Sequence, residues 1–188
     1  MKKITWNSPV VLSFALLSAA SLAAGWLTGG RSTAYLFTVY RGSLADPLFY
    51  LRLLTHVLGH ASLEHYANNM LLFLLVGPLL EEKYGSRNLL EIIVIVAVIT
   101  GLVHILISPA TGLLGASGVV FAFILLASVT GTKNSNSIPL TLLIAALIYI
   151  TQQIFHGVVL RDNVSQLTHI IGGAIGAVYG MAVNPHRK

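Results

Sequence analysis

The residue types best suited to chemistry in this chain are a serine and two histidines that stand in apolar stretches. Ser117 lies in Gly115-Ala116-Ser117-Gly118, with His65 and Asn69 upstream and His169 downstream. Polar groups cost free energy inside a membrane, so three such places indicate a functional site. A serine hydroxyl becomes a nucleophile when a base removes its proton, and a neutral imidazole can serve as that base. The pattern predicts a nucleophilic Ser117 served by His169, with no third member required.

Groups that can stabilise an oxyanion accompany this pair. His65 and Asn69 are four residues apart, so they share a face of a helix that begins near Leu63. Ser117 follows a loop rich in helix breakers, which places it in the first turns of the next helix. Backbone amides there lack intrahelical partners and carry the positive end of the helix dipole. The side chains of His65 and Asn69 and the Ser117 amide are therefore predicted to stabilise a tetrahedral intermediate.

Glycines on the face that carries His169 predict how the pair is brought together. His169, Gly172 and Gly176 stand at i, i+3 and i+7, which is one helical face. Two glycines on that face allow a neighbouring backbone to approach closely. The expected neighbour is a helix of small residues, such as the one that carries Gly118.

The composition indicates the elements that must position these residues. Of the 188 residues 55% are hydrophobic and 9% charged, and the mean hydropathy is +0.81. A soluble domain would carry about a quarter of charged residues, so we expect a membrane protein. The chain has no cysteine, which excludes disulfides and thiolate ligands. The net charge of +5 comes from basic residues between apolar runs, which set topology rather than bind nucleic acid.

Six apolar runs are expected to form an all-α bundle of six transmembrane helices, in a single membrane domain over residues 1–188. The second, fourth and sixth runs are marginal in length for a full crossing. An alternative for the first run, which follows Lys2 and Lys3, is a cleavable signal peptide. The predicted spans are Pro9–Thr28, His65–Leu80, Leu89–Ile107, Gly115–Thr130, Ile138–Phe155 and Leu167–Val183.

The distribution of Lys and Arg predicts the orientation. Six spans place both termini on one side, and assigning that side to the cytoplasm puts seven of the 11 basic residues inside. The long connection from Gly29 to Glu64 then lies outside. Its stretch from Ala45 to Arg52 is amphipathic and is expected to lie in the membrane interface. Arg52 is expected to bind carbonyls or lipid phosphates, with its stem along the interface.

Each motif also has a structural interpretation. The Gly-Ala-Ser-Gly segment can be a packing motif, and His65 with Asn69 can be an interhelical hydrogen-bond pair. His169 can cap the membrane interface, where His104 and His156 are also expected without an assigned role. His56, His60 and His65 can be read as a zinc cluster, although no intramembrane carboxylate or H-E-x-x-H motif accompanies them. A single functional site explains the polar residues in these three apolar stretches more simply than three unrelated structural roles do.

Together these segments resemble the rhomboid intramembrane serine proteases, in their minimal six-span bacterial form, over Leu48 to Val183. His65-Tyr66-Ala67-Asn68-Asn69 matches H-x-x-x-N, and the Ser117 segment matches G-x-S-G. His169 through Gly176 matches H-x-x-G-x-x-x-G. The segment Leu51 to His56 resembles the loop motif Trp-Arg, and Glu81 through Gly85 resembles the acidic turn after the second helix.

The resemblance implies a role for each matched residue. Ser117 is the nucleophile and His169 the general base and acid. The oxyanion is stabilised by His65, Asn69 and the backbone amides of Gly115, Ala116 and Ser117. Two departures stand out: Leu51 replaces the tryptophan of the loop motif, and Phe121 replaces a tyrosine that packs on the catalytic histidine.

The function predicted from the sequence is cleavage of transmembrane segments near the outer face of the bacterial cytoplasmic membrane. Expected partners are transmembrane protein substrates and membrane lipids, without nucleic acid, metal or organic cofactor. The oligomeric state stays open. The alternatives are a rhombosortase-like enzyme that processes sorting tails, an inactive rhomboid-like protein that binds membrane clients, and a small transporter. Retention of Ser117 and His169 argues against the inactive form, and polar groups gathered toward one side argue against the transporter.

Overall fold

A computed structural model shows helices throughout the part of the chain that it describes. This part comprises residues 5–130, 140, 143–144, 147–148, 151 and 163–182. Within it the chain forms no strand, and one antiparallel bridge pairs Val39 with Leu113. The all-α prediction therefore holds for the described residues. Their elements are α1 (Pro9–Leu27), α2 (Arg31–Leu36), α3 (Pro47–Thr55), the 3₁₀ helix η1 (His56–Leu58), α4 (Leu63–Tyr84), α5 (Ser86–Ile107), α6 (Ser117–Thr130) and α8 (Asn163–Ala182).

Local signals in the sequence set the first helices. Proline at the first position of α1 loses no helical hydrogen bond, because that amide would have no partner in the helix. Gly29 and Gly30 follow α1 with φ values of 59° and 84°, and this left-handed pair turns the chain from α1 into the short α2. Asp46 then caps α3, where its Oδ1 accepts from the Leu48 amide at 2.9 Å.

The long helices α4 and α5 form an antiparallel pair. Ser62 caps α4, with its Oγ accepting from the His65 amide at 3.1 Å. The turn between the two helices is a single residue, Gly85, whose φ of 82° suits glycine. The cap makes α4 start two residues before the predicted span, and α8 likewise starts four residues early, at Asn163.

The main core lies between α1, α4, α5 and α6. Phe73 of α4 packs between two aromatic rings, with centroids 4.6 Å from Phe14 of α1 and 5.1 Å from Phe123 of α6. A Cβ on Gly77 would lie 2.8 Å from Val11 Cγ2, so this glycine lets α1 and α4 approach closely. On the other side of α6 lies α8, and the two helices make the most extensive contact among the described helices.

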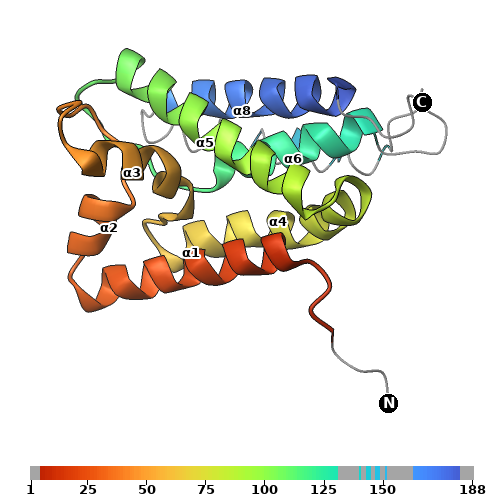
Figure 1. The fold of residues 1–188 in the computed structure, drawn as a ribbon, viewed down its shortest axis with the longest axis horizontal. Coiled ribbons are helices and arrows are strands. Elements are labelled where there is room, and N and C mark those ends of the chain that lie inside the picture. The colour runs from red at the N-terminus through yellow and green to blue at the C-terminus, as the bar shows by residue number, and fades with distance from the viewer. Residues whose placement is uncertain are drawn as a thin grey trace.

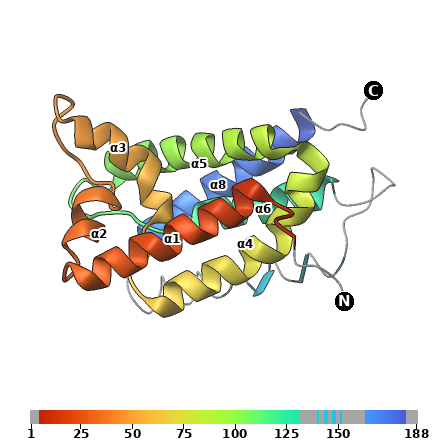
Figure 2. The same ribbon diagram turned by 60° about the horizontal axis from the view of Figure 1, so that its bottom comes forward.

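The bundle has two distinct ends. Helices α2 and α3 lie together at one end, next to the last turns of α1 and the connection that leads into α6 (Figures 1 and 2). The first turn of α1 and the last turn of α8 lie at the opposite end in both views. The arrangement puts the start of α6, and with it Ser117, at the end that α2 and α3 cover.

Two of the described helices, α1 and α5, are long and apolar enough to cross a membrane. Helix α4 has 22 residues but does not reach the same hydropathy, and α6 is apolar with only 14 residues. The second and sixth spans were predicted to be marginal in length, but α4 has 22 residues and α8 has 20. The marginal length predicted for the fourth span agrees with the 14 residues of α6. The predicted fifth span, 138–155, lies largely outside the described residues; those of it that are described are helical. His156 also lies outside them.

Candidate active site

Ser117 is the first residue of α6, at the end of a segment that several hydrogen bonds hold in place. Val39 and Leu113 exchange two backbone hydrogen bonds of 2.9 Å each. His104 Nε2 binds the Thr111 carbonyl at 3.1 Å. The first helical hydrogen bond of α6 runs from the Val120 amide to the Ala116 carbonyl at 2.9 Å. Ser117 therefore stands in the first turn, where the helix dipole presents its positive end.

Gly115 brings Ser117 and His65 to one place. Its φ of 129° is a conformation that residues with a side chain rarely adopt. A Cβ at this position would lie 2.9 Å from both Cε1 and Nε2 of His65, and 3.8 Å from the Ser117 Oγ. The imidazole of His65 therefore occupies the space that a side chain at residue 115 would need, beside the Ser117 hydroxyl.

The His65 ring is oriented by its own loop. The Ala61 amide donates to His65 Nδ1 at 3.5 Å, which makes Nδ1 an acceptor. In a neutral imidazole the other nitrogen then carries the proton. Nε2, the atom near Gly115, is thus the donor of the ring. This tautomer suits donation to an oxygen that develops negative charge near Ser117.

Asn69 lies one turn further along α4 and is 2% exposed. Its Nδ2 donates to the His65 carbonyl at 3.0 Å, so the carboxamide lies along the same face as His65. The predicted sharing of one helical face is therefore present. A role for Asn69 toward an oxyanion stays a prediction.

The amide of Gly115 differs from the expectation. It donates to the His56 carbonyl at 2.9 Å, so this hydrogen bond engages it away from any oxyanion. Of the three amides implied by the resemblance, those of Ala116 and Ser117 remain as candidates. The contribution of Gly115 is instead steric, because it leaves room for the His65 ring.

Helix α8 lies against the start of α6 through its glycines. A Cβ on Gly172 would lie 3.0 Å from the carbonyl carbon of Gly118, and one on Gly176 would lie 2.7 Å from that of Ala122. Neither position has room for a side chain, because backbone atoms cannot move aside as a flexible side chain can. The two helices therefore pack backbone to backbone next to Ser117.

His169 lies on α8, three residues before Gly172. Its place on the helix is thus beside the contact between Gly172 and Gly118, the residue after Ser117. Its side chain lies outside the described part of the structure, and the dyad stays a prediction. The buried ring of Phe121 lies against α8 at Gly173, where a Cβ would be 2.6 Å from Phe121 Cδ1. The ring that replaces the family's tyrosine thus packs one turn after His169.

Three other histidines bind backbone carbonyls. His56 Nε2 lies 2.9 Å from the Ala97 carbonyl, and His60 Nδ1 lies 3.1 Å from that of Leu58. Burial lowers the pKa of His56 and that of His60 from 6.5 to about 4. Within the described residues no three His, Asp or Glu side chains gather as a metal site. His104, expected at the interface, is 2% exposed and holds the segment before Ser117.

His56 has a role at the site that the sequence did not predict. Its carbonyl fixes the Gly115 amide and its ring fills a gap against α5, where a Cβ on Gly101 would lie 3.3 Å from Nε2. Ala97 and Gly101 are small residues four apart, a spacing that marks close packing on a helix face. This spacing could have indicated that a bulky side chain from another segment packs against α5 at these positions.

Arg52 is buried in the cap formed by α2 and α3, with 3% of its surface exposed. Its Nε donates to the Tyr35 carbonyl at 2.8 Å, and Nη1 lies 3.3 Å from Asp46 Oδ2. The guanidinium also lies 4.5 Å from the centre of the Tyr40 ring. Arg52 therefore joins three segments of the loop between α1 and α4, while the neighbouring Leu51 is 41% exposed.

The acidic turn at the end of α4 holds α1. Glu81 is buried, and its carboxylate accepts from the amides of Val10 and Val11 at 2.9 and 3.0 Å. The Ser86 hydroxyl donates to the same carboxylate at 2.7 Å. A negative charge at a helix N-terminus is favourable, so Glu81 stabilises the position of α1 against α4.

Comparison with known proteins agrees with these features. The family model described as "Rhomboid domain" matches residues 48–186. The chain is 25% identical to Rhomboid-like protein 15 of Arabidopsis thaliana over an alignment of 189 positions, which covers 93% of this chain and 47% of the relative. It is 28% identical to Rhomboid-related protein 1 of Caenorhabditis elegans over 140 residues, covering 70% and 39%. The chain thus spans less than half the length of these relatives. With its apolar helices and a matching domain of nearly 140 residues, this membrane protein belongs to the rhomboid family.

Proposed function

We propose that this chain is an intramembrane serine endopeptidase that cleaves transmembrane segments of other proteins. The observation that carries the proposal is the junction at Gly115, where the His65 imidazole and the Ser117 hydroxyl approach one point at the start of α6. The close backbone contact between α6 and α8 supports a base on α8 at the position of His169. A metal or organic cofactor is not required by this chemistry.

In the proposed reaction the Ser117 Oγ attacks the carbonyl carbon of the scissile peptide bond while its proton passes to His169. The carbonyl oxygen becomes negative and accepts hydrogen bonds from His65 Nε2 and from the amides at the start of α6, with Asn69 as a further candidate donor. His169 then gives the proton to the leaving amine, and the C–N bond breaks. Water, deprotonated by His169, hydrolyses the acyl-enzyme and restores Ser117.

The proposed setting is a six-span bundle in the bacterial cytoplasmic membrane, with both termini in the cytoplasm and α2 and α3 on the outer side. Water reaches Ser117 from that side, and a substrate helix must unwind there to expose its backbone. Membrane lipids are the expected surroundings. Single cysteines at Ser43 and Asn134, labelled with an impermeant maleimide in intact cells, test the orientation. Labelling at position 43 alone would support the proposed orientation, and labelling at position 134 alone would show the opposite orientation.

Cleavage of a model transmembrane substrate by the purified protein in detergent tests the activity. We expect Ser117→Ala to abolish cleavage. Ser128→Ala is the matched control, because Ser128 is a buried serine of the same helix whose hydroxyl binds the Ile124 carbonyl at 2.8 Å. It should leave the rate within about twofold, since that hydrogen bond is local to the helix. Cleavage that persists in Ser117→Ala refutes Ser117 as nucleophile.

The second candidate is a rhomboid-like protein that binds membrane clients without cleaving them. The names of the two relatives do not distinguish the forms. The arrangement around Gly115 favours the enzyme, because a client-binding protein has no need of an imidazole N–H beside a serine hydroxyl. Binding of clients by a wild-type protein that cleaves none of a panel of transmembrane substrates would favour the inactive form. A rhombosortase-like specificity for sorting tails is tested with a glycine-rich tail in the same assay.

A further inference from the structure

The connection from α5 to α6 ends at Ser117 and is anchored to the rest of the protein at three points. Its residues 109–112 are exposed, so burial contributes little to its position. Instead the Thr111 carbonyl, the amide and carbonyl of Leu113 and the Gly115 amide each form a hydrogen bond with another segment. These anchors stand at every second residue, as expected for one edge of an extended backbone. They set the place at which α6 begins.

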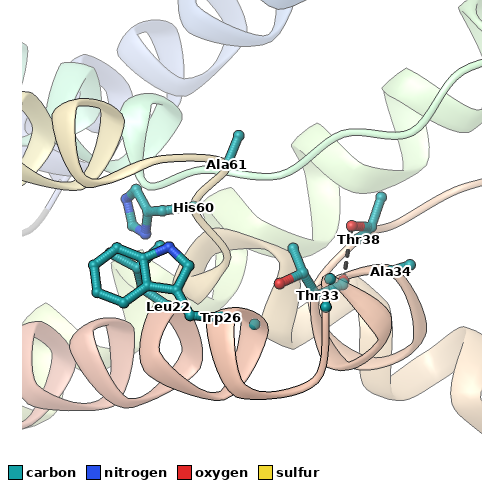
Figure 3. A pocket seen from close by; sticks show the side chains of 10 residues that line it. Leu22, Trp26, Thr33, Ala34, Thr38, His60 and Ala61 are labelled. Atoms are coloured by element: carbon teal, nitrogen blue, oxygen red, sulfur yellow. Dashed lines mark hydrogen bonds between the residues drawn. The ribbon is translucent and has the colours of Figure 1, made fainter.

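The three anchors come from three different segments. His104 of α5 binds the first at 3.1 Å, Val39 binds the second through two hydrogen bonds of 2.9 Å, and His56 of η1 binds the third at 2.9 Å. The segment with Val39 is itself tied to α2, because the Thr38 hydroxyl donates to the Thr33 carbonyl at 2.9 Å (Figure 3). In the second and third anchors both partners are backbone atoms. Only the first of the three depends on a side chain, the His104 imidazole.

The His104 imidazole is buried in the last turn of α5, with 2% of the residue exposed. Its Nε2 carries the proton, because the Thr111 carbonyl can only accept. Nδ1 has no hydrogen-bond partner in the described part of the chain, so the ring makes its one hydrogen bond there to Thr111. A polar side chain on an apolar helix such as α5 costs free energy that leucine would avoid. The imidazole is therefore explained by the carbonyl that it holds and not by packing.

We propose that His104 is a positioning residue for the cleavage reaction, and that its Nε2–H fixes the connection so that the Ser117 hydroxyl stands beside the His65 ring. The inference rests on the proposed function, since it needs Ser117 as the nucleophile. His104 acts through the backbone. The carbonyl that it holds lies four residues before Gly115, whose missing side chain leaves room for the His65 ring.

Loss of this anchor should change the rate more than the stability. Residue 111 is exposed, so water can donate to its carbonyl when the imidazole is replaced, and the carbonyl is not left without a partner. Water does not fix the connection in one place, however, and a displacement of about 1 Å at a reacting group can cost about 10² in rate. With two anchors left, we expect kcat to fall about tenfold. KM should change less than about twofold, because no contact with the substrate is removed.

Three variants separate the hydrogen bond from the packing. His104→Leu removes the donor and keeps an apolar side chain in its place. His104→Gln places an amide nitrogen at the ε position, so it can still donate to the Thr111 carbonyl and should keep kcat within about twofold of wild type. Thr100→Val is the matched control one turn earlier on α5, where a buried hydroxyl donates to the Val96 carbonyl of the same helix at 2.6 Å. It should also keep kcat within about twofold, since that hydrogen bond is local to the helix.

The two constants kcat and KM are measured on a model transmembrane substrate in detergent, and thermal unfolding checks the fold of each variant. His104→Asn, whose amide ends short of the ε position, carries the test if His104→Leu does not fold. A folded His104→Leu protein with the wild-type kcat, or a His104→Gln protein as slow as His104→Leu, overturns the inference while the proposed function stands. A wild-type protein that neither cleaves nor reacts with a fluorophosphonate refutes the proposed function, and the positioning role with it.

Hydrogen exchange adds a readout that does not depend on activity. The amides of Leu113 and Gly115 donate to the second and third anchors, so their exchange reports how firmly the connection is held. We expect faster exchange in His104→Leu than in the wild-type protein, and wild-type exchange in His104→Gln and Thr100→Val. Equal exchange in His104→Leu and the wild-type protein would contradict the anchoring role of His104.

Discussion

Replacing Gly115 with alanine tests the geometry of the candidate site most sharply. Two effects follow from the structure. The backbone at Gly115 has a φ of 129°, which strains any residue with a side chain, and the new Cβ would lie 2.9 Å from the His65 ring. The ring must move out of its place beside Ser117, because the added atom belongs to the backbone frame and cannot turn away.

The expected magnitudes of the two effects differ. Backbone strain of this kind costs roughly 1 to 3 kcal/mol of folding free energy. Loss of one oxyanion donor costs roughly 3 to 4 kcal/mol in the transition state, or about 10² to 10³ in rate. Gly115→Ala should therefore lower the cleavage rate of the folded protein about a hundredfold or more, with only a modest loss of stability.

Gly85→Ala is the matched control. Gly85 also has a positive φ, 82°, but a Cβ there would meet nothing within 4 Å. It should lose stability through strain alone and keep the wild-type rate once the folded fraction is taken into account. The assay pairs cleavage of a transmembrane substrate with thermal unfolding in the same detergent. A Gly115→Ala protein that cleaves as fast as Gly85→Ala would refute the assignment of His65 as an oxyanion donor.

Three further outcomes are expected. Glu81→Gln should lower the free energy of unfolding by roughly 1 to 3 kcal/mol, because a neutral carboxamide binds the α1 amides less strongly than a carboxylate does. Glu82→Gln, at the exposed neighbouring position, is the control and should change the free energy of unfolding little. Equal effects of the two variants in thermal unfolding would contradict the capping role of Glu81. The free energy of unfolding should fall by up to about 3 kcal/mol for each ring as the pH drops from 6.5 toward 4. The reason is that His56 and His60 have a pKa of about 4 in the folded protein, so the unfolded chain binds protons at a higher pH than the folded protein does. His60→Phe should make the unfolding free energy depend less on pH. An unchanged pH dependence would contradict the contribution of His60. Arg52→Ala should lower both stability and activity in part, and a stable variant without any activity would show that Arg52 acts in the chemistry.

Sequence reasoning reached the elements of the site because its signals are local. The four-residue spacing predicts that His65 and Asn69 share a face, and the glycines of α8 predict a close contact with a neighbouring helix. The predicted start of the helix that carries His65, near Leu63, is confirmed, because the polar cap Ser62 is also a local signal. The start of α8 was less accurate, because its first residues, from Asn163, precede the apolar run.

Contacts between distant segments could not be predicted. The Gly115 amide was expected to face an oxyanion, but it binds the carbonyl of His56, 59 positions earlier in the chain. Glu81 was noted only as part of an acidic turn, although it caps a helix that begins some 70 residues before it. Neither pairing leaves a periodic signal, since each depends on how whole helices pack.

The most direct test of the central claim is covalent labelling of Ser117 by a fluorophosphonate. The probe needs a serine activated by a base, and no substrate has to be known. We expect the wild-type protein to be labelled at Ser117, as mapped by mass spectrometry, and Ser117→Ala to lose the label. His169→Ala should slow labelling by several orders of magnitude, because nucleophile and base act as one unit. A folded wild-type protein that resists the probe, or one labelled equally well without His169, would contradict the account.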